Sequence, residues 1–263
     1  SKTNKLMDTF NQNFEGMRKA GHLAALTLDM LVDFVKPGIS TEELDRKAFD
    51  FITKHGANIA PLFYKGYPKS ICTSLNHVIC HGIPSSRTLE EGEILNIDVT
   101  VILDGWHGDT SRMFPVGKVN GKSQRLMDCT YESMLRGINV ISPNKKLGDI
   151  GYAIQSYAEE NNFSVVRDFC GHGLGKMFHE FPNILHYGEP NTGEQISAGM
   201  IFTVEPMINV GKYDVRMLGD GWTAVTKDKS LSAQYEHSVG VTSNGVEIFT
   251  KSPAGLDKPE IKD

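Results

Sequence analysis

The sequence predicts a mixed α/β protein made of two similar halves, and two observations support this. A long helix, a proline and a second helix occur around Pro37 and again, 106 residues later, around Pro143. A strand pattern with an acid also recurs, because Asp98 in NIDVT and Glu205 in IFTVE lie 107 residues apart. We therefore expect each half to bring an acidic side chain to a shared interface.

Four helices are expected. In the first, over about residues 10–35, apolar side chains recur at helical spacing until a proline and a glycine end the pattern. The second follows Ser40, which forms a capping box with Glu43. Residues 123–141 and 147–160 carry the same apolar periodicity and complete the set.

Residues 96–114, NIDVTVILDGWHGDTSRMF, predict a β-hairpin. Asp104-Gly105 is a dipeptide that a type I′ turn favours, and the flanking residues alternate between apolar and polar. A turn there places Thr100 opposite Asp109 and makes Asp98 and Asp109 diagonal neighbours, with backbones roughly 7–8 Å apart. Two converging carboxylates repel unless a cation or a proton lies between them, which indicates a metal site. A solvated outer face with two ordinary acids is the alternative.

The stretch from Ile59 to Ile83 is irregular and rich in aromatic, cysteine and histidine side chains. Such loops are candidate pocket walls, and a strand pair with core aromatics is the alternative. The side chains concerned are Phe63, Tyr64, Tyr67, Cys72, His77, Cys80 and His81.

Histidines and a further acid follow in the second half. His172 stands between glycines, which let a backbone approach a ligand closely, while a plain turn is the other interpretation of GHGLG. His179 follows on the next short segment. Residues 233–241, AQYEHSVGV, predict one strand with Glu236 and Ser238 on the same face.

Composition narrows the class of protein. The net charge of −5 and the lack of a basic run argue against a nucleic-acid partner. No apolar run approaches the roughly 20 residues that cross a bilayer, and the amino-terminal residues lack a signal-peptide core, so we expect a soluble cytoplasmic protein without membrane attachment. The four cysteines show no CxxC pairing and predict neither a zinc knuckle nor a disulfide framework.

Five residues form the candidate ligand set. Carboxylate oxygens with a single imidazole suit Mn(II), Fe(II), Co(II) or Zn(II), and so many acids indicate two divalent ions that share ligands. The set is Asp98, Asp109, His172, Glu205 and Glu236.

Six motifs, in order and at compatible spacing, show that the chain resembles the bacterial type I methionine aminopeptidases of peptidase family M24A. The resemblance runs from about residue 14 to residue 249. The motifs are CHGIP at 80–84, the hairpin at 96–114, GHGLGKMFHEFP at 171–182, FTVEPM at 202–207, DGWTAVTKD at 220–228 and AQYEHSV at 233–239.

The resemblance implies the pita-bread fold, with two pseudo-symmetric halves around a central antiparallel sheet. It implies one catalytic domain over residues 1–263, of which the polar residues 252–263 are expected to be flexible. It also implies a two-metal hydrolase that removes the initiator methionine from new proteins whose second residue is small and uncharged, by means of a water that the metal ions activate.

The same resemblance implies roles for individual residues. All five candidate ligands match metal ligands, with Asp109 and Glu236 as the bridging pair and Glu205 also passing on the proton. His179 matches the histidine that steadies the tetrahedral intermediate, and His81 matches the one near the scissile nitrogen and the leaving peptide. The walls for the methionine side chain match Tyr64, Tyr67, Cys72, Phe178 and Trp222.

The chain departs from the family pattern at two positions: Lys65 stands where many relatives carry histidine, and Pro61 where several carry cysteine. The family implies a monomer that acts on amino-terminal methionyl peptides of nascent chains, with the ribosome as a candidate partner. A proline-directed aminopeptidase of the same fold and a non-catalytic binding module are the alternative functions. Proline-directed relatives usually carry an extra amino-terminal domain, and binding modules typically lose metal ligands.

Overall fold

The computed structural model describes residues 2–260, except for the side chains of residues 3, 4 and 6–9. The first half contains α1 (Lys2–Leu31), α2 (Thr41–Lys54), β1 (Asn58–Ile59), the 3₁₀ turn η1 (Tyr64–Gly66), β2 (Cys72–Leu75), β3 (Val78–Cys80), β4 (Ile94–Leu103) and β5 (Trp106–Pro115). The second half begins with α3 (Gly121–Asn139), α4 (Leu147–Glu160), β6 (Ser164–Val165), β7 (Gly171–Gly173) and β8 (Glu180–Ile184). It ends with β9 (Ile201–Val204), β10 (Met207–Asn209), β11 (Val215–Met217), β12 (Ala224–Thr226), β13 (Ser232–Gln234), β14 (His237–Val241) and β15 (Val246–Ile248).

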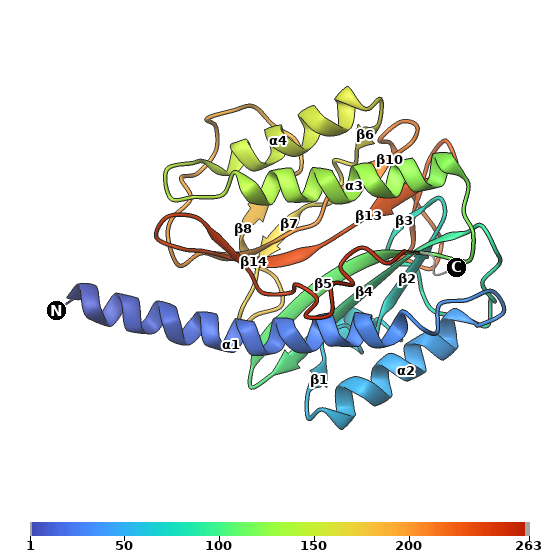
Figure 1. Ribbon diagram of the computed structural model, residues 1–263, viewed down its shortest axis with the longest axis horizontal. Coiled ribbons are helices and arrows are strands. Elements are labelled where there is room, and N and C mark those ends of the chain that lie inside the picture. The colour runs from blue at the N-terminus through green and yellow to red at the C-terminus, as the bar shows by residue number, and fades with distance from the viewer. Residues whose placement is uncertain (1, 261–263) are drawn as a thin grey trace.

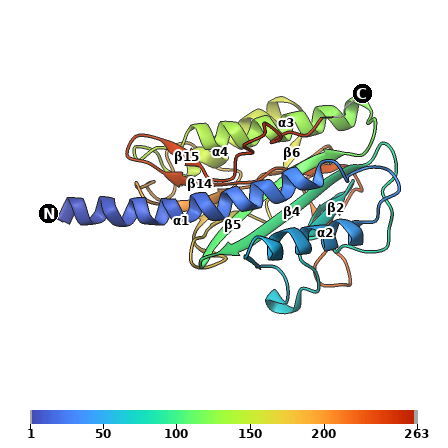
Figure 2. The same ribbon diagram turned by 60° about the horizontal axis from the view of Figure 1, so that its bottom comes forward.

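The helices cover the strands in two pairs. In Figure 1, α1 and α2 lie along one side of the strands and α3 and α4 along the other. Each pair covers its own apolar core, one centred on α1, α2 and β4 and the other on α3, α4, β9 and β14. The first turns of α1 project beyond the rest of the protein (Figures 1 and 2). Among the described residues, no helix is both long enough and apolar enough to cross a membrane.

The two helix pairs show the expected duplication. The second helix of each pair has 14 residues, and α4 starts and ends 106 residues after α2. Ser40 caps α2, because its side chain accepts a hydrogen bond from the Glu43 amide at 3.1 Å. The first helix begins earlier than predicted, at Lys2. It also ends earlier, at Leu31, because residues 32–34 already form a turn before Pro37.

The hairpin at residues 96–114 has the predicted register. Strands β4 and β5 pair antiparallel, with Thr100 opposite Asp109 and Asp98 opposite Ser111. Positive φ angles at Asp104 and Gly105 confirm the turn. Strands β1 and β2 extend the same sheet on the other edge of β4.

The strand predicted over residues 233–241 is two strands, so that prediction is wrong in part. β13 pairs with β10, whereas β14 pairs with β9. The chain changes sheets between them, at Glu236, whose backbone exchanges hydrogen bonds with Ser111 of β5 at 3.0 and 3.3 Å. This crossover brings the second half onto the first-half hairpin.

The segment after residue 251 packs against the body over part of its length. The Ser252 amide donates to Asp257 at 2.8 Å, the Leu256 carbonyl accepts from Arg112 at 3.1 Å, and Lys258 pairs with Asp128 at 2.6 Å. Flexibility of residues 252–263 stays a prediction, and for residues 252–258 these contacts argue against it. Residues 261–263 lie outside the described part of the chain.

Candidate metal centre and substrate pocket

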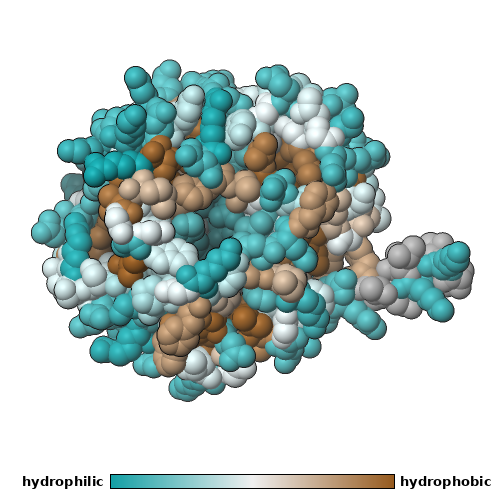
Figure 3. Space-filling model, turned by 180° about the vertical axis from the view of Figure 1, so that it is seen from behind, coloured by the Kyte–Doolittle hydropathy of each residue, from teal (hydrophilic) through white to brown (hydrophobic). Residues whose placement is uncertain are grey.

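A pocket of about 460 Å³ brings the predicted site residues together. Figure 3 shows the molecule from the side opposite to the view of Figure 1, hollowed near the centre of that face. Of the twelve predicted residues, eleven line this pocket: Tyr64, Tyr67, Cys72, His81, Asp98, Asp109, His172, Phe178, His179, Glu205 and Trp222. The twelfth, Glu236, lies directly behind the wall, since its carboxylate and ligand atoms of Asp109 and His172 all lie within 4.8 Å of one another.

The hairpin register explains the position of the first two acids. Alternation along β4 turns Asp98 and Thr100 to the same face, where the Thr100 hydroxyl donates to Asp109 Oδ1 at 2.8 Å. This hydrogen bond leaves Asp109 Oδ2 facing His172 Nε2 at 3.3 Å. Asp109 is almost completely buried and Asp98 is half-buried.

His172 presents one ring nitrogen to the acids. Its Nδ1 lies 3.0 Å from the Gly173 carbonyl oxygen, which can only accept, so Nδ1 carries a proton and donates. Its Nε2 lies 3.3 Å from Asp109 and 3.4 Å from Glu205. With Nδ1 protonated, Nε2 is the nitrogen that faces two carboxylates, so it either carries a second proton or directs its lone pair at a cation between them.

Glu205 follows directly after β9, and three neighbouring residues hold it by hydrogen bonds. Thr203 donates its hydroxyl to Glu205 Oε1 at 2.8 Å and accepts a hydrogen bond from the His172 amide at 3.0 Å. Gln234 donates to Glu205 Oε2 at 3.1 Å, and His186 Nε2 accepts from the Glu205 amide, also at 3.1 Å. Thr203 thus couples two of the five candidate ligands.

Glu236 is buried without a donor. Both of its carboxylate oxygens are shielded from solvent, and neither accepts a hydrogen bond from any residue in the described range 2–260. Burial, and next the nearby charge of Asp109, raise the pKa of Glu236 well above its ordinary value. An unpaired buried carboxylate is costly, so this site calls for a cation or a proton.

The neighbouring groups show the same electrostatic conflict. Burial, followed by the charges of Asp109 and Glu205, raises the pKa of Asp98 well above its ordinary value. Burial is also the main cause that raises the pKa of Glu205 to about 7. For His172, burial lowers the pKa, but the acids outweigh burial and raise it to about 9. Without a cation, the cluster must therefore hold protons.

The donor set fits divalent metal ions. Carboxylate oxygens and one imidazole nitrogen suit Mn(II), Fe(II), Co(II) and Zn(II). Two observations carry this fit: His172 Nε2 faces two carboxylates, and both carboxylate oxygens of Glu236 are buried without a partner among the described residues.

Two further histidines lie on the pocket wall near the acids. The His179 ring lies 4.3 Å from the His172 ring, stacks on Phe178 at 3.9 Å, and has its Nδ1 3.3 Å from the Tyr64 hydroxyl. Burial, and next the neighbouring His172, lower the pKa of His179 to about 4. Burial likewise lowers the pKa of His81. Both histidines are therefore uncharged at neutral pH and can exchange hydrogen bonds with a bound peptide.

Aromatic rings build the apolar part of the pocket. Tyr64 contacts Phe178 with ring centroids 5.0 Å apart, and Tyr67 contacts Trp222 edge-on at 5.1 Å. The Tyr67 hydroxyl donates to the Ile71 carbonyl at 2.8 Å, which fixes its ring. Both interpretations of residues 59–83 hold in part. β2 and β3 are strands, although they pair with β4 and β12 and not with each other. Tyr64 and Tyr67 line the pocket, whereas Phe63 is exposed and lies outside its lining.

Several supporting residues were not predicted as part of the site: Phe169, Thr203, Met207, His186 and Gln234. His186 and Gln234 approach Glu205 from segments 19 and 29 residues away, and no local pattern links these residues. Thr203 did carry a signal, because strand alternation places it on the same face as Glu205.

This geometry defines a candidate divalent-metal site in a pocket, and sequence similarity shows that the class of protein is a metallopeptidase. Residues 15–243 match metallopeptidase family M24, so the chain belongs to that family. The chain is 60% identical to a methionine aminopeptidase of Rickettsia prowazekii over 94% of its length and 96% of that protein. It therefore belongs, within family M24, with the methionine aminopeptidases.

Solved structures show the same fold. A crystal structure of the Rickettsia prowazekii enzyme superposes with a TM-score of 0.91, over 92% of this chain and 98% of that one. A prolidase from Pyrococcus furiosus, 21% identical, superposes with a TM-score of 0.73 over 91% of this chain and 64% of that one, and it shows the fold alone. The predicted pita-bread fold is confirmed.

Proposed function

We propose that the protein removes the initiator methionine from nascent proteins whose second residue is small and uncharged, with two divalent metal ions. The observation that carries this proposal is the cluster of four acids and His172 at the base of an aromatic pocket, in a chain 60% identical to a methionine aminopeptidase.

The five candidate ligands divide the work of holding the ions. Asp109 and Glu236, whose ligand atoms lie together with that of His172, are the proposed bridging pair. Asp98 would then help to hold one ion, and His172 and Glu205 would help to hold the other. Bound there, divalent ions supply Lewis-acid chemistry that polarises the scissile carbonyl and acidifies water.

The proton and the substrate are handled by the side chains themselves. Glu205, a carboxylate at the edge of the cluster, takes a proton from the attacking water and delivers it to the leaving amine. His179, fixed between Phe178 and Tyr64, donates a hydrogen bond to the oxygen on which negative charge develops. His81 hydrogen-bonds the leaving peptide.

The apolar pocket holds the methionine side chain. The pocket offers aromatic faces and a thiol, which suit a flexible thioether through sulfur–aromatic contact. The residues are Tyr64, Tyr67, Cys72, Phe178 and Trp222.

We further propose that the chain forms one catalytic domain and acts as a cytoplasmic monomer on amino-terminal methionyl peptides, with the ribosome as a candidate partner.

Methionine release tests the proposal. Metal-stripped protein is mixed with Met-Ala-Ser or Met-Lys-Ser, with and without Mn(II), Fe(II), Co(II) or Zn(II). We expect metal-dependent release from the first peptide only. Cleavage of neither peptide by protein that has bound metal would contradict the proposal and favour the proline-directed peptidase or the binding module.

A further inference from the structure

A single lysine lies at the mouth of the pocket. Lys65 is exposed, belongs to the 3₁₀ turn at Tyr64–Gly66 and lines the pocket. Its ammonium lies 5.4 Å from the centroid of the Tyr64 ring, and the hydroxyl of that ring lies 3.3 Å from His179 Nδ1. One aromatic ring therefore separates the Lys65 charge from the proposed reacting centre.

The backbone fixes this lysine in an uncommon conformation. Phe63 and Lys65 have φ angles of 66° and 47°, in the left-handed region that residues other than glycine rarely adopt. Hydrogen bonds from the Phe63 amide to the Tyr67 carbonyl at 2.8 Å, and from the Tyr67 amide to the Tyr64 carbonyl at 2.9 Å, close the loop. Strained backbone of this kind is concentrated at functional sites.

The charge of Lys65 has no acidic partner in the described part of the chain. Among residues 2–260, Lys65 makes no ion pair within 4.0 Å. The other exposed charge on the pocket wall is Asp168, and over the same range it is also unpaired. Asp168 precedes Phe169, whose ring meets His81 edge-on at 5.6 Å, so Asp168 lies on the side of the pocket that carries His81. Lys65 follows Tyr64, whose ring contacts His179, so Lys65 lies on the side that carries His179. Both charges are available to a bound peptide.

We propose that Lys65 determines specificity at the third residue of the substrate, where it favours an acidic side chain over a basic one. This inference rests on the proposed function. With the scissile bond at the metal centre, the first two residues fill the pocket, and each further residue extends the peptide by at most about 3.6 Å towards the mouth. Past His81, the third side chain leaves the pocket between the side that carries His81 and Asp168 and the side that carries His179 and Lys65. An acidic side chain there turns away from Asp168 and within reach of the flexible lysine stem.

The expected effect is modest and sensitive to salt. Exposed ion pairs change equilibrium constants by about two- to fivefold, and salt screens them. The test measures kcat/KM for Met-Ala-Glu-Ser, Met-Ala-Gln-Ser and Met-Ala-Lys-Ser at low and high ionic strength. The proteins are the metal-loaded wild type and the variants K65Q, K65R, D168N and K122Q. Lys122 is an exposed lysine on α3, outside the pocket lining, and serves as the matched control.

We expect the ratio of kcat/KM for the Glu peptide to that for the Lys peptide to fall about two- to fivefold in K65Q. K65R and K122Q should keep the wild-type ratio, and high salt should reduce the wild-type ratio towards that of K65Q. An unchanged ratio in K65Q, or a ratio altered by D168N alone, would overturn the assignment to Lys65. Cleavage of the neutral Gln peptide tests the proposed function separately, since it does not depend on this charge.

Discussion

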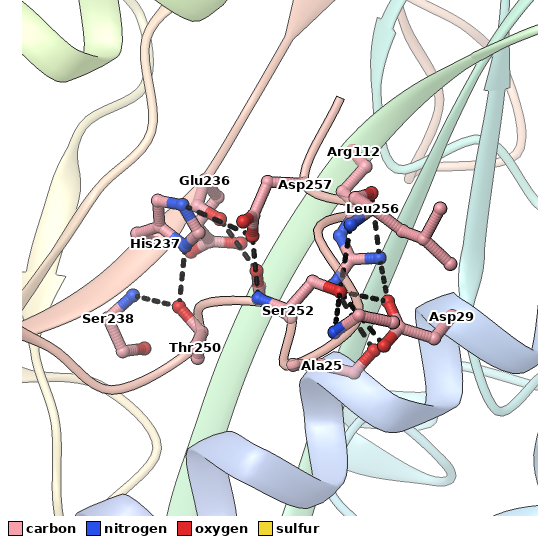
Figure 4. Close-up of polar contacts among 12 residues, drawn as sticks. Ala25, Asp29, Arg112, Glu236, His237, Ser238, Thr250, Ser252, Leu256 and Asp257 are labelled. Carbon is pink, nitrogen blue, oxygen red and sulfur yellow. Dashed lines mark hydrogen bonds and ion pairs between the residues drawn. The ribbon is translucent and has the colours of Figure 1, made fainter. Parts of the chain in front are cut away.

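The guanidinium of Arg112 and the carboxylate of Asp29 lie 2.5 Å apart in the interior and join β5 to α1 (Figure 4). Arg112 also donates to the carbonyls of Ala25 and Leu256, and the Ser252 hydroxyl donates to Asp29 at 2.9 Å. The strand that carries Asp109 is thereby attached to both the first helix and the carboxy-terminal segment.

Replacing Arg112 by Met should destabilise the protein strongly. The variant keeps most of the side-chain volume but leaves the Asp29 carboxylate buried without its cation, so we expect a loss of about 3–5 kcal/mol in the free energy of unfolding. Urea denaturation measures this. Arg136 forms an exposed pair with Glu132, and R136M should cost less than about 1 kcal/mol. Equal, small losses in both variants would contradict the role given to Arg112.

Replacing His179 by Ala should lower kcat by about 100-fold or more while metal binding is largely retained. His179 contacts the Tyr64 hydroxyl and stacks on Phe178, and we assign it to the substrate and not to the metal ions, although its ring lies beside that of His172. Its loss should therefore remove a hydrogen bond to the reacting oxygen and leave the five candidate ligands in place. Steady-state kinetics and metal titration by calorimetry separate the two effects. Unchanged kcat with lost metal would show that the residue is a ligand instead.

Metal binding should release protons near neutral pH. In the metal-free protein, burial raises the pKa of Glu205 to about 7, and the acids raise that of His172 to about 9 in spite of burial. A metal ion displaces these protons, so its affinity should fall as the pH falls. Calorimetry at pH 7 in buffers of different ionisation enthalpy should give at least about one proton released, and roughly half a proton fewer in E205Q. Metal binding without proton release would show that the cluster holds no protons in the metal-free protein.

His186 should make the protein less stable in mild acid. Burial lowers its pKa from 6.5 to about 3, so below pH 6.5 the unfolded state gains a proton that the folded state does not bind. Stability is therefore lost as the pH falls from 6.5 towards 3, by about 1.4 kcal/mol per pH unit for this residue.

The variant H186Q isolates this effect, because a glutamine amide oxygen can still accept from the Glu205 amide but does not titrate. We would measure the free energy of unfolding of metal-stripped protein by urea denaturation between pH 6.5 and pH 5. This free energy should fall less steeply with falling pH in H186Q than in the wild type. Parallel slopes would mean that His186 is not the titrating group.

The sequence carried most information where local pattern determines structure. Asp104-Gly105 and strand alternation were sufficient to pair Thr100 with Asp109, and the repeated helix–proline–helix pattern revealed the two halves. Side-chain chemistry alone suggested the candidate ligand set, whereas the roles of its members came from the family motifs. GHGLG, for example, has no periodicity that distinguishes a ligand-bearing strand from a turn.

Long-range contacts account for what the sequence did not predict. The strand break at Glu236 follows from its pairing with Ser111, 125 residues earlier. The alternation of residues 233–241 does not identify that distant partner. The contacts of residues 252–258 were missed for a related reason. A polar, proline-containing segment predicts fraying, but the buried Arg112 guanidinium needs acceptors and finds one in the Leu256 carbonyl.

Anomalous diffraction from crystals grown with Mn(II) would locate the metal ions without reference to activity. We expect two peaks per chain between the carboxylates of Asp109 and Glu236, one beside Asp98 and the other beside His172 and Glu205. A single peak away from Glu236, or no peak in this cluster, would contradict a two-metal centre.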